Sequence, residues 1–253
     1  PISGQGRHTA AALSPLTGGL ADSQCGGWWG VELKFAGYDG LIVEGKAPGP
    51  VYIAIEDNKV EILPADHLWG KCTGEVQAQL QQVHSKKARV LQIGPAGENL
   101  VRYANITADL RNFNGRGGLG AVMGSKNLRA IVVRGSQRKL NVADPAGLNQ
   151  VATWFSRSTK NHPAVGLHHE LGTSKGIVPV SVAGMLPTYN FQDGSFDQAE
   201  GISGETMKRE LNGETETCFA CAVSCKRSVE GERGKFKITR EYGGPEYESI
   251  GLL

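Results

Sequence analysis

Three of the five cysteines stand close together late in the sequence, at Cys218, Cys221 and Cys225. Two intervening residues let a chain turn around a metal centre, and three allow about one helical turn, so that one centre can take all three thiolates. Thiolates are the soft ligands that iron–sulfur clusters and zinc require. The spacing therefore predicts a metal site. Three unpaired thiols that serve as small core residues are the competing interpretation.

We favour an iron–sulfur cluster over zinc at these cysteines. A structural zinc site usually shows paired two-residue spacings and a fourth ligand nearby, and this segment of sequence has neither. The order of the spacings is the reverse of the C-x-x-x-C-x-x-C order of radical enzymes. A [4Fe–4S] cluster needs a fourth ligand, which is either Cys25 or Cys72 or a residue beyond Leu253, and we prefer the last of these.

A glycine-rich segment with arginines beside it lies in the middle of the chain. Residues 115–124 read GRGGLGAVMG and contain a literal G-x-G-x-x-G. We reject a nicotinamide dinucleotide site, because residues 108–114 do not have a strand pattern and no carboxylate ends a second strand about 20 residues further on. Backbone N–H groups without Cβ obstruction, flanked by Arg111 and Arg116, suit phosphate oxygens. The segment predicts a phosphate-binding loop, and a tight turn that needs glycine for positive φ is the alternative.

Two other groups of residues receive structural interpretations. His168, His169 and Glu170 could be drawn as a metal site, but without a further ligand at useful spacing we predict a surface helix. Trp28 and Trp29 are expected to pack under a bound group or in the core.

The elements that must position these residues begin with short strands. Residues 51–55 and 60–63 alternate as a hairpin around the turn-competent pair Asp57-Asn58. A helix is predicted next: Thr73 can cap it, and Val76, Leu80 and Val83 fall on one face. Further β-type runs are predicted at 41–43, 90–93, 101–106 and 130–133.

The pattern changes after Arg138. Asp144-Pro145 reads as an N-cap followed by proline at the first helical position, and apolar residues then recur at helical spacing through Phe155. A second helix is predicted to begin at Ser203. We therefore expect an α+β protein with a strand-rich domain over residues 1–139 and the start of a mainly helical domain over residues 140–253.

Composition narrows the possible functions. The formal net charge is +2 with mixed Lys, Arg, Asp and Glu, which argues against nucleic acid or an anionic membrane surface as the partner. No apolar run approaches the roughly 18 residues that cross a bilayer. An odd number of cysteines, three of them clustered, predicts a reducing cytoplasm rather than a secreted disulfide framework. The chain starts without methionine and stops in an apolar stretch, so we expect a fragment of a longer protein.

Several stretches, taken together and in order, resemble the aldehyde:ferredoxin oxidoreductases, and the resemblance spans nearly the whole chain. They are residues 14–19, 25–27, 32–40, 93–99 and 115–128, the cysteine cluster and residues 244–249. The resemblance implies a strand-rich base under two pterin cofactors that hold one tungsten, or sometimes molybdenum. It also implies a missing N-terminal start and a missing C-terminal portion.

The resemblance assigns cofactor contacts residue by residue. Arg7 falls on an arginine that contacts a pterin, and Gln24 on an asparagine that helps bind the magnesium between the two pterin phosphates. Gly26, Gly115 and Arg116 fall on further cofactor-contact positions, and Phe113 on a residue whose carbonyl reaches the same magnesium. This chain departs from the family at Asn112, where arginine is common, with Arg111 beside it. Gln24 is one methylene longer than the family's asparagine.

The resemblance also implies a reaction. Cys218, Cys221 and Cys225 fall on three of the four ligands of a [4Fe–4S] cluster, which leaves Cys25 and Cys72 as ordinary thiols. An aldehyde would be oxidised to a carboxylic acid with oxygen from water, and electrons would pass through the cluster to ferredoxin. Glu248 falls on a carboxylate near the metal that could handle a proton. A homodimer is compatible with the resemblance.

Three rival functions stay open. A reductase of the same family could act on an acid or an aromatic thioester. A non-catalytic iron–sulfur electron carrier would have no need for a phosphate-binding loop at Gly115–Gly124. A zinc-stapled interaction module would contain zinc without tungsten, molybdenum or iron.

Overall fold

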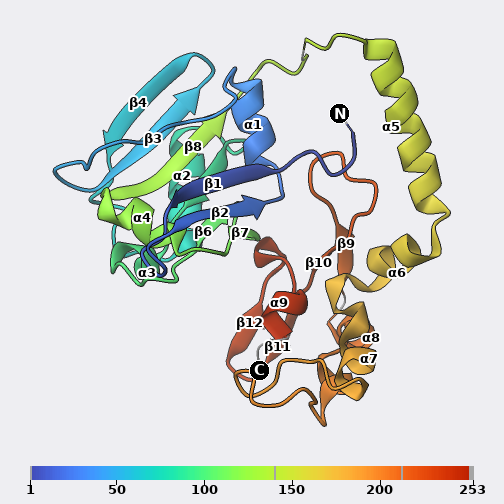
Figure 1. The fold of residues 1–253 in the computed structure, drawn as a ribbon. Helices are drawn as coiled ribbons and strands as arrows, with labels where there is room; N and C mark the ends of the chain where they lie inside the picture. The colour runs from blue at the N-terminus through green and yellow to red at the C-terminus, as the bar shows by residue number, and fades with distance from the viewer. Residues whose placement is uncertain (1, 140, 212, 251–253) are drawn as a thin grey trace. The chain divides into compact units, whose positions relative to one another are not determined.

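The computed structural model describes residues 2–139, 141–211 and 213–250 (Figure 1). Residue 140, where we placed the domain boundary, lies outside the described residues, as do residues 251–253 of the apolar C-terminal stretch. The chain divides into two compact units. One is Gly6–Asp144, here called the sheet unit. The other, here called the cysteine unit, combines the described residues of Pro1–Gln5 with those of Pro145–Leu253.

The described part of the sheet unit contains a six-stranded sheet with the order β4-β3-β8-β5-β6-β7. Strands β3 and β8 are parallel, and the other neighbours are antiparallel. A separate antiparallel pair joins β1 (His8–Leu13) to β2 (Leu20–Cys25). The bounds of the six are β3 Val51–Glu56, β4 Lys59–Pro64, β5 Arg89–Gln92, β6 Ile106–Ala108, β7 Asn112–Asn114 and β8 Leu128–Arg134.

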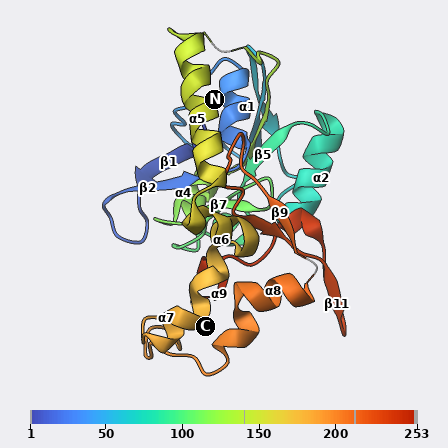
Figure 2. The same ribbon diagram turned by 90° about the vertical axis from the view of Figure 1, so that its right-hand side faces the viewer.

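Both faces of this sheet are covered by helices. Apolar residues of α1 (Trp29–Phe35) and α4 (Leu119–Ser125) pack on one face, with Ile131 and Val133 of β8 in the same core. The other face packs against α2 (Thr73–Val83), and Ala130 and Val132 contribute to that core. Figure 2 shows β5 between α1 and α2. Successive residues of β8 thus face opposite cores, as a strand buried on both sides requires.

The prediction with the strongest local pattern is confirmed, and several predictions from weaker patterns are wrong. The hairpin forms as β3 and β4, with Asp57 at φ 48° in the turn. Helix α2 is capped by Cys72 rather than by Thr73, and Val83 at its end is 69% exposed instead of facing the core. Residues 41–43 lie in irregular backbone, and of the run 101–106 only Ile106 enters a strand.

A buried ion pair connects strand β8 of the sheet to the short helix that ends at Glu98. The Arg129 guanidinium and the Glu98 carboxylate lie 2.7 Å apart, with side-chain exposures of 0% and 3%. Arg129 also donates to the Gln92 side chain and to the Lys71 carbonyl, while Glu98 accepts from the N–H of Gly70. Strand β8 is therefore joined by an ion pair to the helix α3 (Pro95–Glu98) and by a hydrogen bond to the segment that precedes α2.

The cysteine unit mixes helices with short hairpins. The helices are α5 Pro145–Lys160, α6 Pro163–Leu171, α7 Ile177–Val182, α8 Gly204–Glu210 and α9 Tyr247–Ile250. The predicted start of a helix at Ser203 is confirmed, since Ser203 is the N-cap of α8 and its hydroxyl accepts from the N–H of Thr206. The strand pairs β9 (Glu214–Glu216) with β10 (Lys226–Ser228) and β11 (Gly231–Arg233) with β12 (Phe236–Ile238) were not predicted. The α+β class is confirmed.

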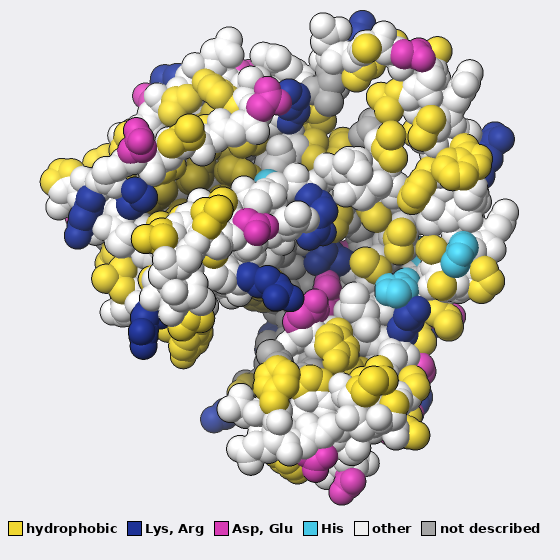
Figure 3. All heavy atoms as spheres, in the orientation of Figure 1, with side chains coloured by type: hydrophobic (Ala, Val, Ile, Leu, Met, Phe, Trp, Pro, Cys, Tyr) yellow, Lys and Arg dark blue, Asp and Glu magenta, His cyan; other side chains and the backbone are white. Residues whose placement is uncertain are grey.

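Within the described residues, none of the helices is both long and apolar enough to cross a membrane. Basic and acidic side chains are interspersed on the face that Figure 3 shows.

The Arg129–Glu98 pair gives a stability prediction. Arg129→Met leaves the Glu98 charge buried without its partner, so we expect a loss of about 3–5 kcal/mol in the free energy of unfolding. Urea denaturation followed by tryptophan fluorescence measures it. Adding Glu98→Gln to Arg129→Met removes the uncompensated charge and should recover much of the loss. A single variant that loses under about 1 kcal/mol would contradict a structural role for this pair.

Candidate functional site

The predicted cofactor residues of the sheet unit come together where β1, β2 and β7 meet. The Asn114 amide, fully buried, links the three strands: its Oδ1 lies 2.9 Å from His8 Nε2, and its Nδ2 donates to the Ser23 carbonyl at 2.6 Å. The Ser23 hydroxyl accepts from the N–H of Arg116 at 3.2 Å. In the β1–β2 register Gln24 lies opposite Thr9. Segments 7–8, 23–26 and 112–116 are thus held in one place.

The side chains in this place divide into exposed and buried sets. Asn112 and Asn114 are buried while Phe113 between them is exposed, as the alternation of a strand requires. Gly26 and Arg111 are half-buried. The remaining predicted residues are exposed, and they are Arg7, Gln24, Gly115 and Arg116. Charged and amide groups are therefore available to a ligand around a buried amide.

The Asn112 amide oxygen is one of six buried side-chain polar atoms that have no hydrogen-bond partner among the described residues. Asn112 is 4% exposed, and its Oδ1 has no hydrogen-bond partner among the described residues. Gly27, at φ +98°, lies against the same amide: a Cβ at Gly27 would stand 2.5 Å from Asn112 Nδ2. Buried amide oxygens normally have a partner. This position can take a hydrogen-bond donor from a bound group.

The glycine-rich segment has more structural constraint than its motif suggests. A Cβ at Gly118 would lie 1.9 Å from the Arg102 carbonyl oxygen, and one at Gly124 would lie 2.0 Å from the Gly97 carbonyl oxygen. Gly117 and Gly118 have positive φ, so the predicted tight turn is present. The N–H groups of Arg116 and Gly120 already donate within the protein. These two N–H groups are therefore not available to a phosphate, whereas Gly115 and the side chain of Arg116 are exposed.

Our statement that no strand precedes this segment is wrong, because Asn112–Asn114 forms β7. The dinucleotide interpretation still fails for a topological reason. Strand β7 lies at the edge of the sheet and is antiparallel to β6, whereas a dinucleotide fold places its glycine loop after a parallel strand.

Sequence reasoning missed a carboxylate that organises the arginines here. Asp109 accepts from the Val90 N–H at 3.1 Å and from Arg89 at 3.4 Å, and Arg111 also interacts with its charge. Burial raises the pKa of Asp109, and the two arginines oppose that rise. The Arg89 guanidinium lies 5.1 Å from the Trp28 ring centroid. The signal available in the sequence was an aspartate two positions before the predicted Arg111, whereas its left-handed φ of 50° is a feature of the fold.

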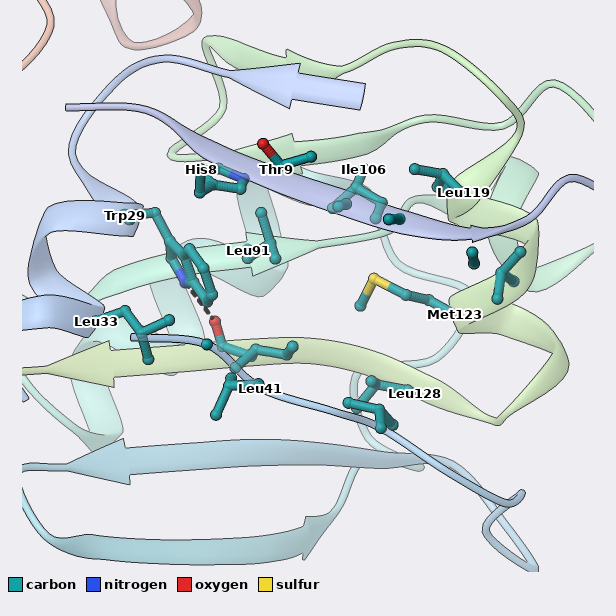
Figure 4. A pocket seen from close by; sticks show the side chains of 18 of the residues that line it. His8, Thr9, Trp29, Leu33, Leu41, Leu91, Ile106, Leu119, Met123 and Leu128 are labelled. Carbon is teal, nitrogen blue, oxygen red and sulfur yellow. Dashed lines mark hydrogen bonds between the residues drawn. The ribbon is translucent and has the colours of Figure 1, made fainter. Parts of the chain in front are cut away.

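A largely apolar cavity of about 500 Å³ lies on the α1 and α4 face of the sheet. Figure 4 shows the side chains of Leu91, Ile106 and Met123 lining it beneath β1, with the Trp29 indole donating to the Ile131 carbonyl at 3.0 Å. Trp29 packs in the core, as one of the two predicted alternatives had it. The lining also contains charged residues, namely Arg7, Asp39 and Lys126. Arg7 and His8 belong both to this lining and to the polar place around Asn112, so the two share residues at the start of β1.

The three clustered cysteines lie on one loop of the cysteine unit between β9 and β10. The Cys221 N–H donates to the Cys218 carbonyl at 3.1 Å, and Ala220 and Ser224 adopt positive φ, which turns the chain around the thiols. All three are half-buried. Among the described residues there is no group of three or more His, Cys, Asp or Glu side chains drawn together closely enough for a single metal ion.

The thiols nevertheless interact electrostatically. Burial raises the pKa of Cys225, and the nearby charges of Glu246, Cys218 and Cys221 raise it further. Burial acts in the same direction on Cys221, but hydrogen bonds from Ser3 and from main-chain N–H groups outweigh it and lower the pKa of that thiol. A loop that stabilises one thiolate and crowds two more near it can bind a polynuclear centre, whose thiolates ligate different metal atoms.

The remaining candidates have simpler surroundings. Cys25 is buried in the sheet unit and its thiol donates to the Gly26 carbonyl, while Cys72 is exposed at the start of α2. His168, His169 and Glu170 lie on α6, where Glu170 pairs with Lys208, so the predicted surface helix is confirmed. Glu248 is exposed on α9, and its proton-handling role stays a prediction.

Two models of one protein family match successive parts of this chain. The family model described as "Aldehyde ferredoxin oxidoreductase, N-terminal domain" matches residues 1–135, and the one described as "Aldehyde ferredoxin oxidoreductase, domains 2 & 3" matches residues 150–253. A tungsten-containing aldehyde ferredoxin oxidoreductase of Pyrococcus furiosus is 41% identical over 98% of this chain, and that of Pyrococcus horikoshii is 43% identical over the same share. The chain spans 40% of the length of each.

A subunit of another enzyme and a solved structure are also similar. An aliphatic sulfonate oxidoreductase WOR-like subunit of Pyrococcus furiosus is 32% identical over 96% of this chain and 40% of its own length. The active site complex BamBC of benzoyl coenzyme A reductase, solved with 1,5-dienoyl-CoA, matches with a TM-score of 0.74 at 31% identity. That match covers 94% of this chain and 38% of the other.

The His8–Asn114 contact gives a pH prediction. Burial lowers the pKa of His8 below its ordinary value of 6.5, the hydrogen bond to Asn114 opposes this, and the charge of Arg7 adds to it. The unfolded chain therefore binds the proton more readily, so stability is retained above pH 6.5 and falls as the pH drops toward the lowered value, by up to about 1.4 kcal/mol per pH unit. Denaturation midpoints between pH 7.5 and 5 measure the slope. His8→Gln should flatten it, and an equal slope in both proteins would contradict the assignment.

Proposed function

We propose, since the chain belongs to the aldehyde ferredoxin oxidoreductase family, that it is the cofactor- and cluster-binding part of a tungsten- or molybdenum-pterin oxidoreductase. The observation that carries the proposal is the match of both family models, in order, over nearly all of the chain. We assign residues 1–139 to pterin binding and residues 140–253 to the start of a helical domain with the cluster ligands. Its clustered free thiols suit a reducing cytoplasm.

The polar place around Asn112 fits a phosphate-bearing pterin. Arg7 and Arg116 are exposed cations that would bind pterin and phosphate oxygens. The unsatisfied Asn112 oxygen would accept from an N–H or O–H of the cofactor, a role that the family's arginine could not take. Arg111, held near Asp109, would supply the cationic contact instead. Gly26 and Gly115 would let the cofactor approach the backbone.

A magnesium ion between the two pterin phosphates would be bound by oxygen atoms from the same strands. We assign the Gln24 side-chain oxygen and the Phe113 carbonyl as its protein ligands, both of which are hard donors of the kind magnesium prefers. Gln24 is exposed at the end of β2, so its longer side chain has room to reach a metal.

The cysteine loop would hold three corners of a [4Fe–4S] cluster through Cys218, Cys221 and Cys225. The hydrogen bonds to Cys221 favour its thiolate, which is the form that binds iron. Lys226 pairs with Glu246 at 2.9 Å directly after the last cysteine, which keeps a cation and an anion beside the loop. The fourth ligand is assigned outside this chain.

The reaction we assign is oxidation of an aldehyde to a carboxylic acid, with transfer of electrons to ferredoxin. When bound, the metal–pterin group supplies the two-electron redox chemistry. This chain's contribution is to orient that group through its arginines and amides and to hold the cluster thiolates. Glu248 would accept a proton from water at its carboxylate as the acid forms. A homodimer is the assembly we propose.

A reductase of an aromatic thioester is the second candidate. It rests on the similarity to the benzoyl coenzyme A reductase complex, which was solved with a dienoyl thioester. The same cofactor contacts would serve the oxidation of an aldehyde or the reduction of a thioester. Assays with aldehydes and with aryl thioesters on the complete protein would separate the two.

Metal analysis of the protein purified without oxygen tests the proposal. We expect tungsten or molybdenum together with iron. Iron alone would contradict the pterin proposal and favour an electron carrier. Zinc without the other three metals would favour the interaction module.

The cluster assignment predicts the effect of replacing one ligand. Cys221→Ser should remove most of the iron and the iron–sulfur absorbance, because a serine hydroxyl is a poor ligand for this soft centre. Cys72→Ser is the matched control: serine also caps helices well, so α2 and the iron content should be kept. An unchanged spectrum in Cys221→Ser would reject the ligand assignment.

A further inference from the structure

Two contacts of one buried amide hold the β1–β2 pair on both sides of Gln24. The Asn114 Nδ2 donates at 2.6 Å to the carbonyl of Ser23, the residue that directly precedes Gln24. The Asn114 Oδ1 lies 2.9 Å from His8 Nε2, and His8 is the ladder partner of Cys25, the residue that directly follows Gln24. The backbone of Gln24 is therefore anchored to Asn114 through both of its neighbours.

The same amide belongs to the residue next to Phe113. Asn114 is fully buried, whereas Gln24 and Phe113 are both exposed. Strands β2 and β7 belong to different sheets of the described part of the chain, so no backbone ladder fixes their separation. The Asn114 side chain joins them instead, through residues adjacent to Gln24 and to Phe113.

This separation matters because Gln24 and Phe113 are the residues assigned to magnesium. The ion demands near-ideal octahedral geometry with oxygen ligands at about 2.0–2.1 Å. Gln24 has a long, flexible side chain, so its oxygen can be held at that distance only if its backbone stays in place. The Phe113 ligand is a main-chain carbonyl, which side-chain rotation cannot adjust. A shift of β2 against β7 would therefore disturb both ligands.

We infer that Asn114 is a positioning residue that sets the spacing of the magnesium ligands Gln24 and Phe113. The inference rests on the proposed function, since it needs a magnesium ion between two pterin phosphates. The amide oxygen and nitrogen of Asn114 both have protein partners, so Asn114 acts through the two strands rather than by binding the ion. Replacing a residue that orients metal ligands typically weakens metal binding by roughly 10- to 100-fold.

The test is magnesium retention by the complete protein, purified without oxygen with its cofactors. Asn114→Leu keeps a similar side-chain volume and removes both hydrogen bonds. We expect this variant to release its pterin at a roughly 10- to 100-fold lower concentration of the chelator EDTA than the parent protein. Pterin fluorescence in the filtrate measures release, and elemental analysis measures magnesium, tungsten, molybdenum and iron. Added magnesium should restore retention by mass action, which it would not do for a purely structural defect.

Gln92→Leu is the matched control. Gln92 is likewise a fully buried amide of the six-stranded sheet, and its nitrogen donates to the Thr73 carbonyl at the start of α2. Its side chain lies on the face of the sheet that α2 covers, so its replacement should cost stability and leave magnesium retention unchanged. Asn114→Asp is the second test variant. It keeps the shape and the acceptor for His8 but removes the donor to the Ser23 carbonyl.

Every outcome bears on the inference or on the function beneath it. Parent-like magnesium retention in Asn114→Leu would overturn the inference alone, and so would an equal loss in Gln92→Leu or a loss that added magnesium does not restore. If Asn114→Leu does not fold, Asn114→Asp decides: weaker retention that magnesium restores supports the inference, and parent-like retention or a failure to fold rejects it. A parent protein with tungsten or molybdenum but no magnesium would overturn the inference and the magnesium assignment. A parent protein with neither tungsten nor molybdenum would overturn the proposed function.

Discussion

The hydrogen bonds of one buried amide fix the geometry on which the cofactor place depends. Asn114 contacts His8 on β1 through its oxygen and Ser23 on β2 through its nitrogen, while its own strand is β7. Since the Asn114 oxygen only accepts, His8 must donate from Nε2, and its Nδ1 is then buried and unpartnered among the described residues. This arrangement therefore favours the neutral form of His8. Any shift of this amide would move β1, β2 and β7 relative to one another.

The parts of the fold that the sequence predicted are those whose signals are local. The β3–β4 hairpin combines alternating apolar residues with a turn pair, and β8 contains the continuous apolar run 130–133, so neighbours in sequence carry the pattern. The strand prediction for residues 41–43 was wrong because an apolar run can also be irregular backbone whose side chains pack on a core, as those of Leu41 and Val43 do. The hairpins of the cysteine unit have short, polar strands without such a pattern.

The same division holds at the candidate site. The candidates Cys218, Cys221 and Cys225 could be predicted because they lie on one short loop and their spacing is visible in sequence. The long-range contacts of the two candidate sites could not be predicted. Ser3 lies 219 positions from its partner Ala222 in the cysteine loop, and His8 lies 106 positions from its partner Asn114 in the sheet unit. Serine, histidine and asparagine at these places have no pattern of their own. Their importance comes from burial and pairing, which only the fold creates.

The glycine-rich segment shows how a motif can point to the right place for an incomplete reason. Four of its glycines, at positions 117, 118, 120 and 124, would collide with neighbouring atoms if they carried a Cβ, so packing alone requires them whether or not a phosphate binds. The glycine count therefore cannot discriminate between a cofactor loop and a tight turn. What discriminates is a buried amide oxygen on Asn112 left without a partner among the described residues, beside a strand that presents Arg111 and Arg116. Six buried side-chain atoms of the described residues have no partner, so the missing partner favours a bound group only together with the two arginines that flank β7. The Asn112 oxygen is an acceptor that the family's arginine would not provide.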